Sequence, residues 1–122
     1  MDDSYLRNLL EKTLNSYKIL SNLRDKPDDL ITIKQELGKI QGMVQVIVNK
    51  IEKSENYSDS FSEFSDAAKS FLKEYSFSRE IDTVLESYPG DSYRIKNIRL
   101  VILEALEKSE LITKAQSLLQ AL

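Results

Sequence analysis

The apolar positions between residues 30 and 51 repeat with the period of a long helix that lies along another helix. Leucine, valine or isoleucine fills the first and fourth positions of just over three heptads: Leu30, Ile33, Leu37, Ile40, Val44, Ile47 and Ile51. This spacing is typical of a helix packed along a second helix. The segment from Ile40 to Asn49 also carries no charged residue, which predicts that the helix is enclosed on more than one side there.

A strand is the competing interpretation for part of this segment. Residues 43–48 are rich in β-branched side chains, which favour extended structure. However, the heptad pattern continues through them to Ile51, and no turn residues bracket them. The sequence therefore predicts a helix over residues 29–53.

Turn and capping residues divide the rest of the chain into further helices. Pro27 and Pro89-Gly90 end two of them, and the apolar phase breaks at residues 76–78. Capping boxes that begin at Ser60 and Thr113 indicate two helix starts. The predicted helices span residues 4–24, 29–53, 60–76, 78–88, 92–109 and 113–121.

Two features of the C-terminal part affect the expected packing. Residues 92–122 alternatively form one unbroken helix, because the apolar phase continues through Ile112 to Leu119. Residues 100–103 are apolar nearly all round, which predicts a central helix. We expect one all-α domain over residues 1–122, an antiparallel bundle of four to five helices with no sheet.

Composition and charge narrow the classes of function. The 122-residue chain has a net charge of −3 and no cysteine, which excludes a disulfide framework. It has no secretory signal at its N-terminus and no apolar run of the ~18 residues that a membrane span requires, so we expect a cytoplasmic protein. Without histidine or cysteine the commonest metal ligands and nucleophile–base pairs are missing. We expect no enzyme activity, catalytic residue, metal, cofactor or small-molecule substrate.

A stripe of small and amide residues follows the 29–53 helix away from its heptad positions. Its members are Gln35, Gly38, Gly42, Gln45 and Asn49, spaced three or four residues apart. Each interior glycine costs about 1 kcal/mol relative to alanine, so a close approach of another backbone is expected along this stripe. Another helix of the same chain is the preferred interpretation, and an external partner is the alternative.

The middle of the chain is acidic and aromatic. Residues 54–93 carry nine acidic and three basic side chains, and eight of the ten aromatic residues lie there. Most of these rings are expected in the core, while Tyr57, Tyr75 and Tyr88 are candidates for contact with a partner, since tyrosine suits interfaces.

Three cations near the start of the 92–109 helix are the candidate for nucleic-acid contact. Arg94, Lys96 and Arg99 lack a helix-turn-helix context, and pairing with the acidic middle is the preferred interpretation. On a helical wheel Lys96 and Arg99 share a stripe, whereas Arg94 lies apart. Cations at a helix N-terminus oppose the helix dipole, so their placement there is unexpected.

In size and helix content the chain resembles small helical-bundle proteins that act by binding another protein, such as toxin immunity proteins, anti-activators and secretion chaperones. That resemblance implies a non-enzymatic interaction module, namely an inhibitor, immunity-type protein, chaperone or adaptor. One alternative is a structural homodimer that pairs through residues 30–51. The second is a nucleic-acid-binding accessory protein that uses Arg94, Lys96 and Arg99.

Overall fold

The computed structural model describes residues 3–54 and 58–122, and every regular element within them is an α-helix. This confirms the all-α prediction. The number of helices in the described residues exceeds the four to five expected for the bundle and equals the number of helical segments predicted from the sequence. The six helices of the described residues are α1 (Asp3–Asn22), α2 (Asp29–Glu52), α3 (Asp59–Glu74), α4 (Ser78–Ser87), α5 (Ser92–Lys108) and α6 (Leu111–Ala121).

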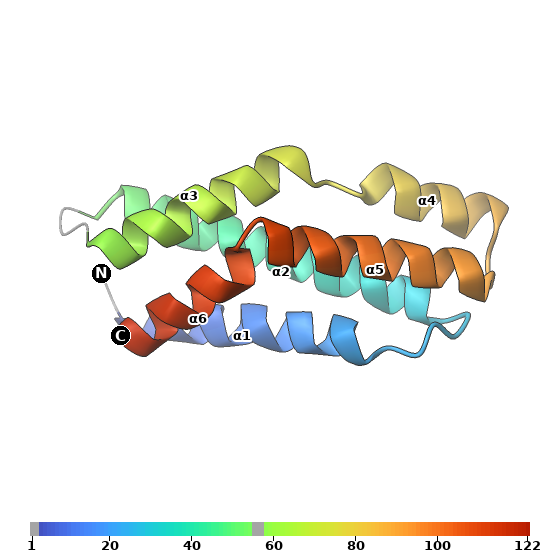
Figure 1. Cartoon of the computed structure of the whole chain (residues 1–122), viewed down its shortest axis with the longest axis horizontal. Coiled ribbons are helices and arrows are strands. Elements are labelled where there is room, and N and C mark those ends of the chain that lie inside the picture. Colours follow the sequence, from blue (N-terminus) through green and yellow to red (C-terminus); the bar gives the residue numbers. More distant parts are fainter. Residues whose placement is uncertain (1–2, 55–57) are drawn as a thin grey trace.

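The helices pack as an elongated bundle around α2 (Figure 1). α1, α2 and α3 alternate in direction, α4 continues onward from α3, and α5 returns along the bundle. α6 bends away from α5 and packs against α1 and α3 at the end of the molecule that also holds the start of α1. α2 contacts α1, α3, α4 and α5, whereas α6 packs against α1, α3 and α5.

The heptad prediction for α2 is confirmed residue by residue. All seven apolar heptad positions from Leu30 to Ile51 are at most 2 % exposed, and residues 43–48 are helical rather than extended. Each such side chain contributes roughly 1.5–3 kcal/mol by leaving water. Phe64 and Phe71 of α3 fill the same core completely buried. The apolar C-terminus is also docked, with Leu118 buried and Leu122 packed against the core.

The helix starts differ from the expected ones in detail. α3 begins at Asp59 because the Ser58 hydroxyl, and not that of Ser60, accepts the hydrogen bond from the Phe61 N–H at 3.3 Å. α5 begins at Ser92 as predicted, and the carboxylate of its N-cap Asp91 accepts hydrogen bonds from the N–H groups of Tyr93 and Arg94. α6 begins at Leu111, two residues before Thr113, so the second predicted capping box does not form the start.

Three of the connections between helices contain a residue other than glycine with a positive φ angle. Asp25, Phe77 and Glu110 have φ angles of 63°, 59° and 64°, in the left-handed region. This conformation costs roughly 1–2 kcal/mol for a residue with a Cβ. Phe77 lies in the break between α3 and α4, and its ring stacks on Tyr75 with centroids 6.1 Å apart. The break that divides residues 92–122 falls at Glu110, so the unbroken-helix alternative is wrong.

α2 is enclosed on more than one side, as predicted, because it contacts α1, α3, α4 and α5, but Gly42, Gln45, Val46 and Asn49 are exposed and leave one side open. α5 is not surrounded either, because Leu100 is 45 % and Val101 51 % exposed. Both helices therefore carry apolar side chains on two sides, one side facing the core and the other not covered by a described helix.

Candidate functional site

The predicted stripe forms one exposed face of α2. Gln35, Gly38, Gly42, Gln45 and Asn49 are all exposed, and the Gln45 amide donates a hydrogen bond to the Asn49 side-chain oxygen at 3.1 Å. A Cβ added at either glycine meets no atom within 4 Å. The preferred interpretation, in which another helix of the same chain packs on the stripe, is therefore wrong for the described residues.

Two apolar side chains adjoin the stripe, one before its first residue and one within its length. Ile31 is 55 % and Val46 37 % exposed, and helical spacing places both on the same side of α2 as Gly38 and Gly42. The sequence analysis missed them because it treated the stripe as amides and glycines only. The signal was present, since neither residue occupies a buried heptad position. We call Ile31, Gln35, Gly38, Gly42, Gln45, Val46 and Asn49 the α2 face.

Ion pairs neutralise the charges along the edge of the α2 face that adjoins α3 and α4. Lys34 pairs with Asp82 of α4 at 3.0 Å, and Glu52 pairs with Lys69 of α3. These pairs are solvent-exposed and add little stability. They matter for the electrostatics of the α2 face, because the charged side chains along this edge already have partners within the chain.

A polar groove lies on the other side, between α1 and α2. It has a volume of about 430 Å³ and contains a buried carboxylate, that of Glu36, which is 6 % exposed. The Ser16 hydroxyl donates to this carboxylate at 2.7 Å, and the Lys39 ammonium lies 3.2 Å from its other oxygen. The buried charge is thus compensated within the chain, which favours a role in pairing α1 with α2.

The predicted tyrosines do not join the α2 face. Tyr57 lies outside the described residues. Tyr75 is half-buried between Phe71 and Phe77 and lines a small hollow beside Val101 of α5. Tyr88 is 41 % exposed at the turn before α5. The two described tyrosines therefore lie near α5, while the stripe belongs to α2.

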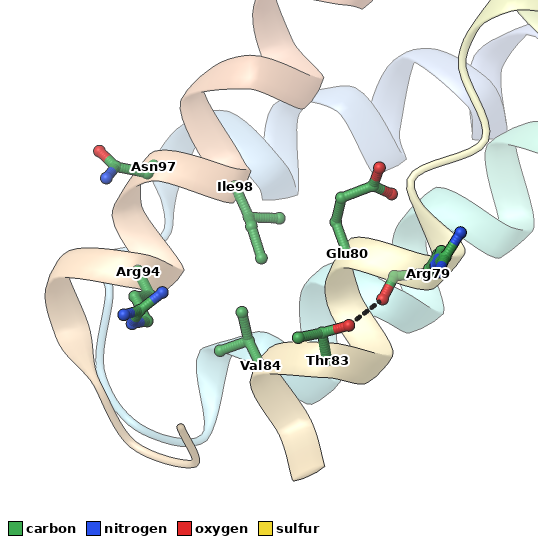
Figure 2. Close-up of a pocket in the computed structure, with 7 residues that line it drawn as sticks. All are labelled: Arg79, Glu80, Thr83, Val84, Arg94, Asn97 and Ile98. Carbon is green, nitrogen blue, oxygen red and sulfur yellow. Dashed lines mark hydrogen bonds between the residues drawn. The ribbon is translucent and has the colours of Figure 1, made fainter. Parts of the chain in front are cut away.

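A groove of about 510 Å³ separates α4 from α5 (Figure 2). Val84 and Ile98 point toward one another across it, so its floor is apolar. Its rim carries both signs of charge, from Arg79, Glu80 and Arg94. The Arg94 guanidinium lies 3.6 Å from the centre of the Tyr88 ring and 3.5 Å from Asp91, so it is held at the turn.

The three predicted cations have three different environments. Lys96 is exposed, Arg94 is paired as described above, and Arg99 is 9 % exposed. Lys96 and Arg99 are three residues apart in α5, as the helical wheel places them, but the Arg99 side chain is buried in the bundle while Lys96 is exposed. The structure therefore does not present these three side chains as one surface.

Arg99 forms a buried ion pair that the sequence did not indicate. Its Nε and Nη2 donate to the two carboxylate oxygens of Asp25 at 2.7 and 3.1 Å, and its Nη1 donates to the Leu20 carbonyl at 3.3 Å. The hydrogen bond to Asp25 raises the already high pKa of Arg99. One side chain thus joins α5 to the end of α1 and to the following turn. Asp25 lies outside the acidic middle, which is where partners for these cations were expected.

The described residues contain neither a candidate metal site nor a candidate membrane span. No three of their His, Cys, Asp or Glu side chains converge in a way that would hold a metal ion. None of the helices that the structure describes is long and apolar enough to cross a bilayer. Known protein families, curated proteins and solved structures contain no match to this chain.

Proposed function

We propose that this chain is a non-enzymatic interaction module, of the inhibitor, immunity-type, chaperone or adaptor kind, that binds another protein through the α2 face. The observation that carries the proposal is the pair of exposed glycines in the middle of the central helix. Together they cost roughly 2 kcal/mol relative to alanine. No packing within the described chain uses the low profile that they create.

The shape and chemistry of the α2 face favour a protein partner. Its centre is low because of Gly38 and Gly42, and Ile31 and Val46 project beside it. A helix or loop laid across the glycines can approach the α2 backbone closely, while the two apolar side chains bury against it. The amides of Gln35, Gln45 and Asn49 supply hydrogen-bond donors and acceptors that are satisfied by backbone groups of a partner.

The charge pattern makes this partner surface largely uncharged. A strongly charged ligand gains little from a face whose bordering lysine and glutamate side chains are paired within the chain. Arg99, one of the cations considered for nucleic-acid contact, is buried against Asp25. The proposal therefore favours a neutral protein surface over nucleic acid.

The test is a pull-down from cell extract with three versions of the full chain. Gly42→Arg places a long charged side chain on the α2 face without a clash, because the site is open. Ser117→Arg is the matched control, since Ser117 is exposed on α6. We expect one stoichiometric protein with wild type and Ser117→Arg, and its loss with Gly42→Arg. Equal recovery with all three baits would refute the α2 face as the binding surface.

A further inference from the structure

The outer face of α5 is a second uncovered apolar surface. Tyr93 is 74 %, Leu100 45 % and Val101 51 % exposed, although the same helix buries Ile95 and Ile102 completely. Leu100 and Val101 are neighbours in the middle of the helix, and no described helix covers them. α5 lies in front of α2 in Figure 1, with α3 and α4 above it and α1 below it. This surface is therefore separate from the α2 face.

Two exposed side chains of α5 carry charges that the helix dipole does not favour, Lys96 near the N-terminus and Glu107 near the C-terminus. The other charges at the helix ends are paired within the chain, Arg94 with the N-cap Asp91 and Glu104 with Lys108 of the last turn. A helix is stabilised by acids near its N-terminus and cations near its C-terminus. Lys96 makes no ion pair among the residues that the structure describes, so this unfavourable placement has no compensation for it within the chain.

An antiparallel neighbour of the same sequence corrects this arrangement. If a second α5 runs in the opposite direction, its end that carries Glu107 lies against the end of the first helix that carries Lys96. The dipole of the second helix is then reversed relative to that of the first. Lys96 and Glu107 are three turns of about 3.6 residues apart and share one edge of the helix. A two-fold axis near Leu100 and Val101 then brings Lys96 of each copy toward Glu107 of the other.

We infer that this face binds a second copy of the chain, as an antiparallel α5–α5 pair centred on Leu100 and Val101. The apolar centre meets itself across the axis, and Lys96 pairs with Glu107 at both ends of the contact. A second copy matches the charges at both ends of the contact by symmetry, whereas a partner of different sequence would need suitable charges at each end independently.

The contact is a small one. α5 has 17 residues, and a helix of that length is roughly 25 Å long. One helix pair of this length buries an area at the low end of specific interfaces, where weak, transient association is typical, so we expect a dissociation constant of the order of micromolar. The dimer is therefore expected to form and dissociate with concentration, and the inference does not depend on the α2 face.

Sedimentation equilibrium of the full chain tests the pairing between about 1 µM and about 1 mM, a range that brackets such an affinity. We expect the mass to rise from 14.0 kDa toward twice that value. Leu100→Glu, a change at an exposed position, should raise the dissociation constant at least about tenfold. Ile31→Glu is the matched control on the α2 face and should leave it unchanged.

A charge exchange tests the orientation. Lys96→Glu alone should weaken the dimer several-fold, and Lys96→Glu combined with Glu107→Lys should restore much of the loss, because the pair is re-formed with reversed signs. Circular dichroism establishes that each variant is folded, since Glu107 also accepts a hydrogen bond from Tyr17. A mass that stays at one chain over the whole range, a dimer insensitive to Leu100→Glu, or no rescue by the exchange would overturn the proposal. Loss of the dimer in Gly42→Arg alone would assign it to α2 instead.

Discussion

Replacing both helical glycines by alanine should make this protein more stable. Gly38 and Gly42 lie in the interior of the 24-residue helix α2, and a Cβ at either position meets nothing within 4 Å. The change therefore adds no clash, and it restricts the unfolded chain more than the folded one. The helix-propensity difference is about 1 kcal/mol at each site, and the two contributions add because the sites share no packing partner. We expect a gain of about 2 kcal/mol in the free energy of unfolding.

Urea unfolding followed by circular dichroism measures this gain directly. The midpoint should rise while the slope stays constant, since the area exposed on unfolding hardly changes. The melting temperature should rise by roughly 4 °C for each kcal/mol. Gly90→Ala is the matched control of opposite sign. Gly90 has a φ of 82°, and its Cβ would lie 3.6 Å from Pro27, so the same substitution there should cost about 1 kcal/mol or more.

A loss of stability in Gly38→Ala with Gly42→Ala, measured at a concentration where the chain is monomeric, would refute the reasoning. It would mean that part of the chain packs on the glycines in solution. The same variant also examines the proposed function. If the α2 face binds a partner closely, the added methyl groups should weaken that binding while the fold becomes more stable. A more stable variant with undiminished binding would remove the glycines from the contact.

Three further changes address groups inside the bundle. Arg99→Met should cost about 3 kcal/mol in urea unfolding, because it leaves the Asp25 carboxylate without its partner and the Leu20 carbonyl without a donor; a cost below about 1 kcal/mol would show that the ion pair is not formed. Ser65→Ala should stabilise by about 1 kcal/mol, since the Ser65 hydroxyl is fully buried without a hydrogen-bond partner; destabilisation would reveal a partner. Partial burial, followed by the hydrogen bond to Glu107, raises the pKa of Tyr17 above 10.0; stability should therefore fall as pH rises beyond about 10, where the unfolded chain loses the proton first, and Tyr17→Phe should flatten that dependence.

The regular spacing of hydrophobic residues predicted the buried side of α2 well. Burial of every residue from Leu30 to Ile51 at the heptad positions follows from geometry, because residues spaced three and four apart share one side of a helix. Helix ends were predicted less accurately. The stretch around Ser58, Ser60 and Ser62 offers several caps of equal chemistry, and the sequence pattern does not distinguish which of them is used.

Exposure of the α2 and α5 faces was not predictable from the same pattern. The period states which residues share a face, but it does not state whether another helix covers that face. The pattern predicts enclosure on more than one side for residues 40–49 and a central helix for residues 100–103. Val46, Leu100 and Val101 are nevertheless exposed. The partner of Arg99 was equally hidden, since Asp25 is 74 residues away in the chain and only the tertiary packing joins them.

The two proposed surfaces are compatible because they belong to opposite sides of the bundle. α5 lies in front of α2 in Figure 1, and each helix turns its apolar core residues toward the interior that they share. An α5–α5 dimer therefore leaves both copies of the α2 face uncovered. Two identical weak contacts held at a fixed separation bind a bivalent or repeated partner far more tightly than one contact does. The glycine pair on α2 then carries the recognition, and the reversed charges of α5 set the number of copies that act together.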